Sequence, residues 1–160
     1  MSKVLAVCLT IVTLACCQLA TAAVKPPVTL NVSYTNAPGG TGDQLLSSGA
    51  LASSVLDGLR ESGVAVVLNA PEANIGVQLN LTALYSPPLD NLRVISGTMA
   101  VRIPRPGAAD FGDAWSSCER GIFLWGARTA QEISIQRIKS GMTQEARNFA
   151  RQCRSELSPN

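Results

Sequence analysis

The side chains that usually carry out catalysis are sparse in this sequence, and one type is missing. There is no histidine, which excludes Ser-His-Asp and Cys-His catalysis and histidine ligands for a metal. The segment GGTG at residues 39–42 lacks the lysine that follows a Walker-type phosphate loop, so it predicts a flexible turn. We therefore expect neither a cofactor nor a metal site.

Carboxylates are the remaining candidates for catalysis. Asp110, Asp113 and Glu119 lie close together in sequence, within and just after the segment DFGDAW. Paired acids held a few ångströms apart in a cleft perform glycosidase-type hydrolysis. Solvation and turn capping in a loop are the commoner roles of such residues, and we favour them. A small carboxylate-dependent hydrolase stays as the alternative.

The first 22 residues have the order of segments found in a secretory signal peptide. Lys3 precedes an apolar run at residues 4–17, and small residues end at Ala22. This order predicts export and cleavage after Ala22, which leaves residues 23–160 as a single domain. The alternative is a lipoprotein signal, in which a lipid on Cys16 or Cys17 would tether the protein to a membrane. The predicted location is periplasmic or secreted, or the outer membrane if the chain is lipidated.

Two cysteines remain beyond the signal, Cys118 and Cys153. Their separation is not that of a zinc site or of a redox Cys-x-x-Cys pair. In an oxidising compartment an even pair is most simply one disulfide, with two free thiols as the alternative. The 13 basic and 11 acidic side chains give a net charge of +2. This balance gives no reason to expect nucleic acid or an anionic membrane as a partner.

The first half of the domain predicts a strand, a helix and a second strand. Apolar residues at Leu30, Val32 and Tyr34 alternate with polar ones, as in a half-buried strand. Asp43 is a candidate N-cap for a following helix, and Gly63 is its candidate C-cap. The run VAVVL at residues 64–68 then predicts a short buried strand.

The second half predicts an antiparallel hairpin, a short strand and a long helix. Residues 75–85 and 95–103 alternate in the same way around a proline-containing loop. AWSSC at residues 114–118 predicts a last, short strand with Trp115 pointing inward. TAQE at residues 129–132 has the form of a capping box. The helix after it has an apolar stripe formed by Ile135, Ile138, Met142, Phe149, Cys153 and Leu157.

The segment GIFLWG lies between the predicted last strand and the last helix. Gly121 and Gly126 are predicted to bracket a turn. If the aromatic side chains of this turn are exposed, they are the best candidate for a contact with a partner, and if buried, they are a hinge of the fold. The four candidate contact residues are Ile122, Phe123, Leu124 and Trp125.

The whole order of elements predicts an α+β fold, with a mostly antiparallel sheet of four to five strands and two helices packed on one face. It resembles small, mostly uncharacterised exported proteins of Gram-negative bacteria. The matching pieces in this chain are Gly63, Trp115, Gly121, Gly126, Phe149 and the terminal SPN at residues 158–160. The layout is also similar to the amino-terminal domain of TolB and to small envelope-assembly proteins.

The resemblance implies a periplasmic, non-enzymatic role and supplies no catalytic residues. We expect a binding or assembly module of the cell envelope, which contacts a protein through a sheet edge or through GIFLWG. The partner would be an envelope or secretion-system protein, or a second copy of the chain. A membrane would be a partner only after lipidation at Cys16 or Cys17. A secreted effector or inhibitor is a further alternative.

Overall fold

The computed structural model describes residues 27–38, 46–70, 73–87, 89, 92–106, 111, 114–126 and 131–158. Several predicted features fall outside this set, namely residues 1–22 with Cys16 and Cys17, Asp43, Asp110, Asp113 and the side chains of residues 129–132. The N-cap predicted at Asp43 is decided by the described residues, as shown below, and the other predictions made on these features stay predictions.

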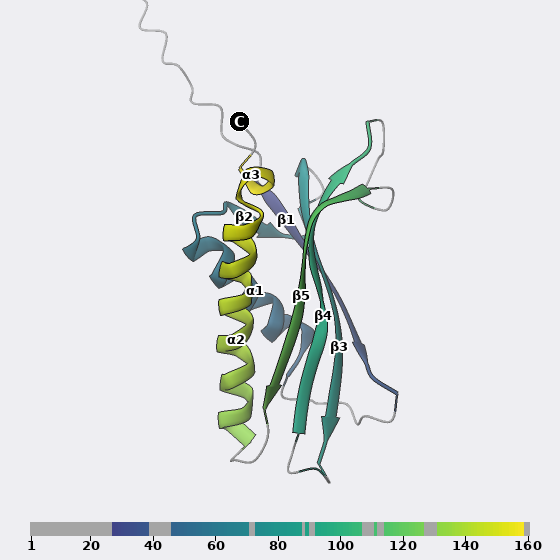
Figure 1. Cartoon of the computed structure of the whole chain (residues 1–160), viewed down its shortest axis with the longest axis vertical. Coiled ribbons are helices and arrows are strands. Elements are labelled where there is room, and N and C mark those ends of the chain that lie inside the picture. Colours follow the sequence, from purple (N-terminus) through teal and green to yellow (C-terminus); the bar gives the residue numbers. More distant parts are fainter. Residues whose placement is uncertain are drawn as a thin grey trace, which may run out of the picture.

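The chain folds into one five-stranded sheet with its two long helices on the same face (Figure 1). The elements in chain order are β1 (Val28–Asn36), α1 (Ser48–Glu61), β2 (Val66–Leu68), β3 (Ile75–Ser86), β4 (Leu92–Pro104), β5 (Ala114–Gly126), α2 (Gln131–Gln152) and α3 (Arg154–Leu157). The strands lie side by side in the order β2-β1-β3-β4-β5. β1 is parallel to β2 and β3, whereas the longer β3, β4 and β5 are antiparallel. The predicted fold class is confirmed.

The ends of α1 are set by local hydrogen bonds. Ser47, not Asp43, is the N-cap, and its hydroxyl accepts a hydrogen bond from the Ala50 N–H at 3.2 Å. This corrects the predicted start of the helix, because the serine satisfies a backbone donor that has no partner within the helix. Gly63 has a φ of +84° just past the helix, which only glycine adopts without strain. The C-cap itself is Ser62, so Gly63 lies one residue beyond the predicted cap position, where it ends the helix.

The strand expected in VAVVL is shorter and less buried than predicted. β2 contains only Val66–Leu68 and pairs with β1 at one edge of the sheet. Val66 is buried, but Val67 and Leu68 are exposed. An edge strand has a neighbour on one side only, so an apolar run there is not buried along its whole length.

The predicted hairpin is present as β3 and β4. Val77 lies opposite Val101 and Leu79 opposite Met99, and all four side chains are buried on the helix side. The residues that alternate with these along each strand point to the opposite face of the sheet, because successive side chains of a strand point to opposite faces. We call the helix-covered side of the sheet the inner face and the other side the outer face.

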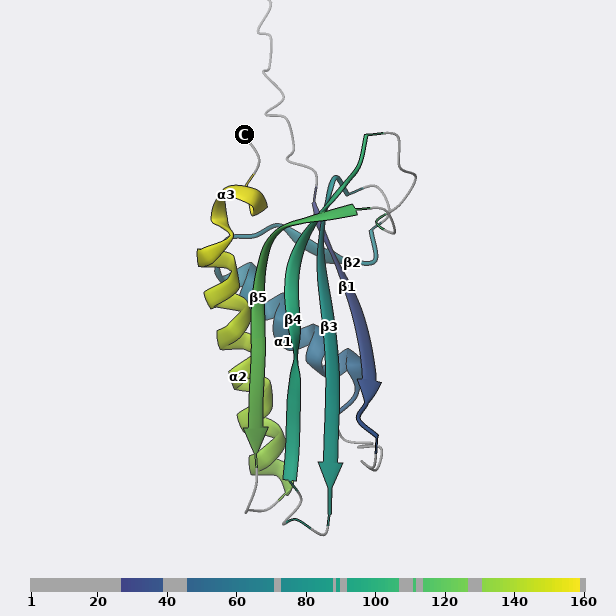
Figure 2. The same ribbon diagram turned by 45° about the vertical axis from the view of Figure 1, so that its right-hand side comes forward.

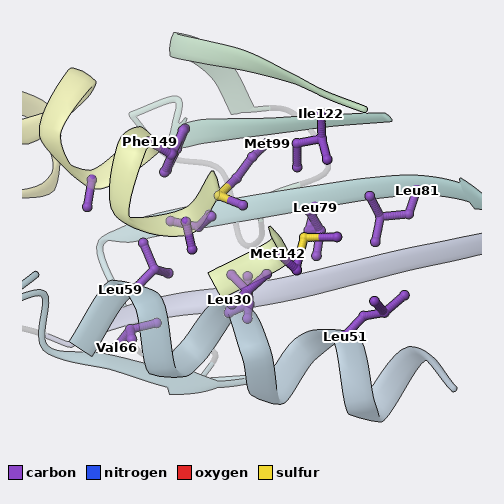
Figure 3. Packing of buried hydrophobic residues seen from close by; sticks show 14 of the residues in the cluster. Leu30, Leu51, Leu59, Val66, Leu79, Leu81, Met99, Ile122, Met142 and Phe149 are labelled. Atoms are coloured by element: carbon purple, nitrogen blue, oxygen red, sulfur yellow. The ribbon is translucent and has the colours of Figure 1, made fainter. Parts of the chain in front are cut away.

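The core lies between the inner face and the two helices (Figure 3). The predicted stripe of the last helix is buried from Ile138 to Leu157, whereas Ile135 is only half-buried. The side chains that fill the core between sheet and helices include Leu30, Leu51, Leu59, Leu79, Met99, Ile122, Met142 and Phe149.

The helices approach each other closely at Gly58 of α1. A Cβ atom added to this residue would lie 2.4 Å from the Thr143 carbonyl oxygen and 2.7 Å from the Ala146 Cβ of α2. The Thr143 hydroxyl lies 3.1 Å from the Ser54 carbonyl oxygen, to which it donates a hydrogen bond. The missing side chain at Gly58 therefore brings α1 and α2 into contact above the sheet.

Candidate functional site

GIFLWG is not a turn, because β5 continues through it to Gly126. Ile122 lies opposite Gly97 of β4 and Phe123 lies opposite Ser96, in unbroken antiparallel register. Alternation places Ile122 and Leu124 on the inner face and Phe123 and Trp125 on the outer face. The predicted turn was wrong because both faces of this segment carry apolar residues, so the period of two is invisible in the sequence.

The four candidate contact residues separate accordingly. Ile122 is buried in the core with an exposed fraction of 4%, and Leu124 packs against its margin. Phe123 is 67% exposed and Trp125 is 49% exposed. Only Phe123 and Trp125 are therefore available to a partner, and we refer to these two side chains as the aromatic pair.

The aromatic pair stands on a face that is mostly polar, although Val94 lies directly opposite Trp125 and Leu84 lies opposite Val94. The outer face of β1, β3 and β4 presents hydroxyl and amide side chains, which include Asn31, Ser33, Thr35, Gln78, Asn80, Thr82, Ser96 and Thr98. Figure 2 shows the sheet in front of α1, with the outer face toward the viewer. At its upper end the ring of Phe111 lies against Gly76.

The two aromatic side chains differ in how they are held. The guanidinium carbon of Arg137, on α2, lies 4.7 Å from the centre of the Trp125 ring, a cation–π contact. This contact restrains the indole at the margin of the sheet. Phe123 is the more exposed of the two, and its neighbour across the strands is the small Ser96.

Trp115, expected to point inward, is 61% exposed. The pairing of β4 with β5 shifts between Val101 and Arg102, so Trp115 lies opposite Ile103. Beyond this bulge the end of β4 and the start of β5 bend away from the helices (Figure 1). Because no helix covers the sheet there, the tryptophan stays in solvent.

A disulfide joins β5 to the end of the helical layer. Cys118 and Cys153 are bonded, with their Cα atoms 5.8 Å apart, as the sequence predicted. Cys153 is fully buried, and Cys118 lies in the middle of β5 rather than at the end of a short strand. The bond therefore fixes α2 against the strand that carries the aromatic pair.

Polar contacts from α2 reinforce this attachment. The Arg120 Nε donates to Glu145 Oε2 at 2.7 Å. The Gln152 side chain donates to the Glu119 carbonyl oxygen at 3.1 Å. In both views α2 runs alongside β5 (Figures 1 and 2). The helix thus runs along this edge of the sheet, whereas β2 forms the other edge.

Catalytic chemistry gains no support from the described residues. Of the three acids near DFGDAW, Glu119 alone is described, and it is exposed on β5. Within the same residues, no three potential metal ligands of the His, Cys, Asp or Glu type come together. A shallow pocket of about 180 Å³ beside the start of α1 is lined by Val32, Ser48, Gly49, Ala52, Leu68 and Asn69, none of which is an acid or a base.

Sequence reasoning missed a second pocket, of about 360 Å³, near the end of α2. It is lined by Ser62, Gly63, Val64, Ala150, Arg151, Arg154, Leu157 and Ser158. Arg151 belongs to the end of α2 and Arg154 to the start of α3. Their meeting with the loop after α1 comes from tertiary packing, and no sequence spacing signals it.

No helix among the described residues is long and apolar enough to cross a membrane. No family model matches the chain, and no curated protein matches its sequence.

Solved bacterial structures with a similar arrangement of elements do exist. PelC from Paraburkholderia phytofirmans, described as a dodecamer, is 17% identical, with 78% of this chain and 85% of that chain covered and a TM-score of 0.46. XCC0632 from Xanthomonas campestris, of the DUF330 family, is 11% identical, with 78% and 81% covered and a TM-score of 0.46. A third, described as an uncharacterized protein, is 16% identical, with 78% and 88% covered and a TM-score of 0.47. The likeness concerns the fold alone.

Proposed function

We propose that this protein is a non-enzymatic binding or assembly module of the bacterial cell envelope, which docks a protein partner on the outer face of β5. One observation carries the proposal: Phe123 and Trp125 stand 67% and 49% exposed on a strand whose other face is built into the core. Aromatic side chains held in this way are the anchors that protein interfaces favour.

The aromatic pair is not needed to fill the core of its own domain. The inner face of β5 is already occupied by Ile122 and Leu124 against the core. An exposed apolar ring contributes little to folding, whereas its burial in a complex removes a large apolar area from water. The pair therefore supports a role in binding.

The surface is also preorganised. The disulfide between Cys118 and Cys153 holds β5 against α2, and Arg137 stacks on Trp125. A rigid strand loses little conformational freedom when a partner binds, so more of the contact energy becomes affinity.

The occupant that fits best is a folded protein with an uncharged apolar surface. The neighbouring outer-face side chains are hydroxyls and amides, such as Ser96 and Thr98 of β4. They form a polar border beside Phe123, whereas Trp125 lies opposite Val94. An apolar centre with a polar border is typical of protein–protein interfaces. The disulfide supports an oxidising compartment, in agreement with the predicted signal peptide.

Site-specific photocrosslinking in the producing bacterium tests the proposal. A photoreactive residue at position 123 should give a specific adduct with an envelope protein, and Trp125→Ser should abolish it. Trp115 is the matched control, because it is an exposed aromatic residue on the same strand at the far end. Equal adducts from positions 115 and 123, or an adduct unaffected by Trp125→Ser, would show that the pair is not the contact.

Light scattering of the purified protein separates the possible occupants. If the partner is a second copy of the chain, the purified protein should form an assembly, and the Phe123→Ser variant should be monomeric. If the partner is a different protein, the purified chain should be monomeric. A partner captured only from host or competitor extracts would identify a secreted effector. Hydrolysis of a glycan or ester that is lost when Asp110 or Asp113 is changed would contradict the non-enzymatic role.

A further inference from the structure

The pocket near the end of α2 is a second polar site, separate from the aromatic pair. It lies between the loop that follows α1 and the turn that joins α2 to α3, and its volume is about 360 Å³. Two arginines, Arg151 and Arg154, line it, and none of the described lining residues carries a carboxylate. A pocket lined in this way attracts an anion.

The nearest acidic side chains have other partners. Glu61 forms an ion pair with Arg147, and Glu156 accepts a hydrogen bond from the Ser155 hydroxyl at 2.7 Å. Arg151 donates to Asn148 Oδ1 at 2.5 Å, which uses one of the five N–H groups of its guanidinium. Glu61 is therefore already paired with another cation, and neither carboxylate lines the pocket.

The hydrogen-bond donors that the pocket offers to a ligand are side-chain groups rather than backbone N–H groups. The Gly63 N–H donates to the Arg60 carbonyl at 2.9 Å and the Val64 N–H to the Leu59 carbonyl at 3.0 Å, so these backbone groups are already engaged. Ser158, Arg151 and Arg154 line the same space, and each has a side chain that can donate hydrogen bonds. Guanidinium forks match the oxygens of phosphate in geometry and charge.

The rest of the lining is apolar. Val64, Ala150 and Leu157 contribute to the pocket and are almost completely buried. Such a wall suits the uncharged part of a ligand, which would lose contact with water there. A ligand with an anionic group and an uncharged body satisfies both parts of the lining.

We infer that the Arg151–Arg154 pocket binds the phosphate group of a phosphate ester. A carboxylate has two oxygens, which one guanidinium group can bind. A phosphate has more oxygens and more negative charge, so it can bind two guanidinium groups at once. β1 starts at the same end of the molecule as α3 (Figures 1 and 2). If a lipid on Cys16 or Cys17 tethers the chain to a membrane, phospholipid headgroups supply the same chemistry.

Calorimetric titration with two probes, inorganic phosphate and monomeric dihexanoyl phosphatidic acid, tests the inference. Wild-type protein should bind at least one probe, and Arg151→Gln and Arg154→Gln should each weaken binding about tenfold or more, the worth of a charge-assisted hydrogen bond. Lys139→Gln is the control, since it removes a charge from the same helix outside the pocket. Tighter binding of the lipid than of phosphate points to a headgroup, and equal binding to a soluble ester.

A second variant distinguishes the pocket from general positive charge. Ser158→Trp changes an exposed residue at the rim and should block binding without altering the charge, while the thermal unfolding curve stays unchanged. Failure of wild-type protein to bind either probe at millimolar concentration would overturn the inference. Binding that survives both arginine substitutions, or that Lys139→Gln weakens equally, would overturn it as well.

Discussion

The two faces of the sheet are built from the same strands, but the inner face forms the core and the outer face is exposed to solvent. The inner face carries aliphatic side chains such as Leu79 and Met99, which α1 and α2 cover completely. The outer face carries mostly polar side chains, and its apolar residues include the exposed aromatic pair on β5 and the partly buried Leu84 and Val94 beside it. The difference teaches that apolar residues on one strand must be assigned to a face before they are assigned a role, because only the inner ones stabilise the fold.

The largest loss of stability is expected for a substitution in the core that covers the inner face. Phe149→Ala removes a fully buried ring of α2 and should lower the free energy of unfolding by about 3 to 5 kcal/mol, because a cavity remains. Urea denaturation measures the change. The matched control is Phe123→Ala, which deletes the same ring from the outer face, and equal losses at both positions would contradict the distinction between the faces.

Breaking the bond that holds β5 to α2 should have the next largest effect. The disulfide spans a sequence separation of 35 residues, and loop closure of this length is worth about 3 to 4 kcal/mol in the chain-entropy model. The variant with both Cys118→Ser and Cys153→Ser should therefore unfold at lower urea concentration. Reduction of wild-type protein by dithiothreitol should give the same shift, and no shift under either treatment would refute the prediction.

The helix contact that closes the inner face predicts a smaller change. Gly58→Ala places a methyl group against the Thr143 carbonyl oxygen and should destabilise the protein by about 1 to 3 kcal/mol through overpacking. Gly49→Ala, in the same helix, has only the Ser47 hydroxyl within reach, at 3.8 Å. It should stabilise by about 0.5 to 1 kcal/mol, because alanine favours the helix. Changes of the same sign would refute the assigned contact.

The smallest effect on stability belongs to the outer face. Phe123→Ser changes a side chain that is 67% exposed and should alter the free energy of unfolding by no more than about 0.5 kcal/mol. The same variant should lose the crosslinked partner or the assembly. A large loss of stability with binding retained would make the aromatic pair part of the fold rather than of an interface.

Much of the fold was predictable because it depends on local periodicity. The alternation in β3 and β4 predicted the hairpin, and the stripe through Met142 and Phe149 predicted the buried side of the last helix. The pairing of Cys118 with Cys153 followed from counting the cysteines outside the predicted signal peptide. Each of these inferences needs only the spacing or number of residues along the chain.

The sequence by itself determined the missing histidine chemistry, the α+β class, the hairpin, the long helix and the cysteine pair. Tertiary structure decided that GIFLWG continues β5, that Trp115 is exposed and that Arg151 and Arg154 meet the loop after α1. The reason is physical. Whether an apolar side chain is buried depends on which helix lies over its face, and a pocket needs two segments far apart in sequence, so neither is encoded in local spacing.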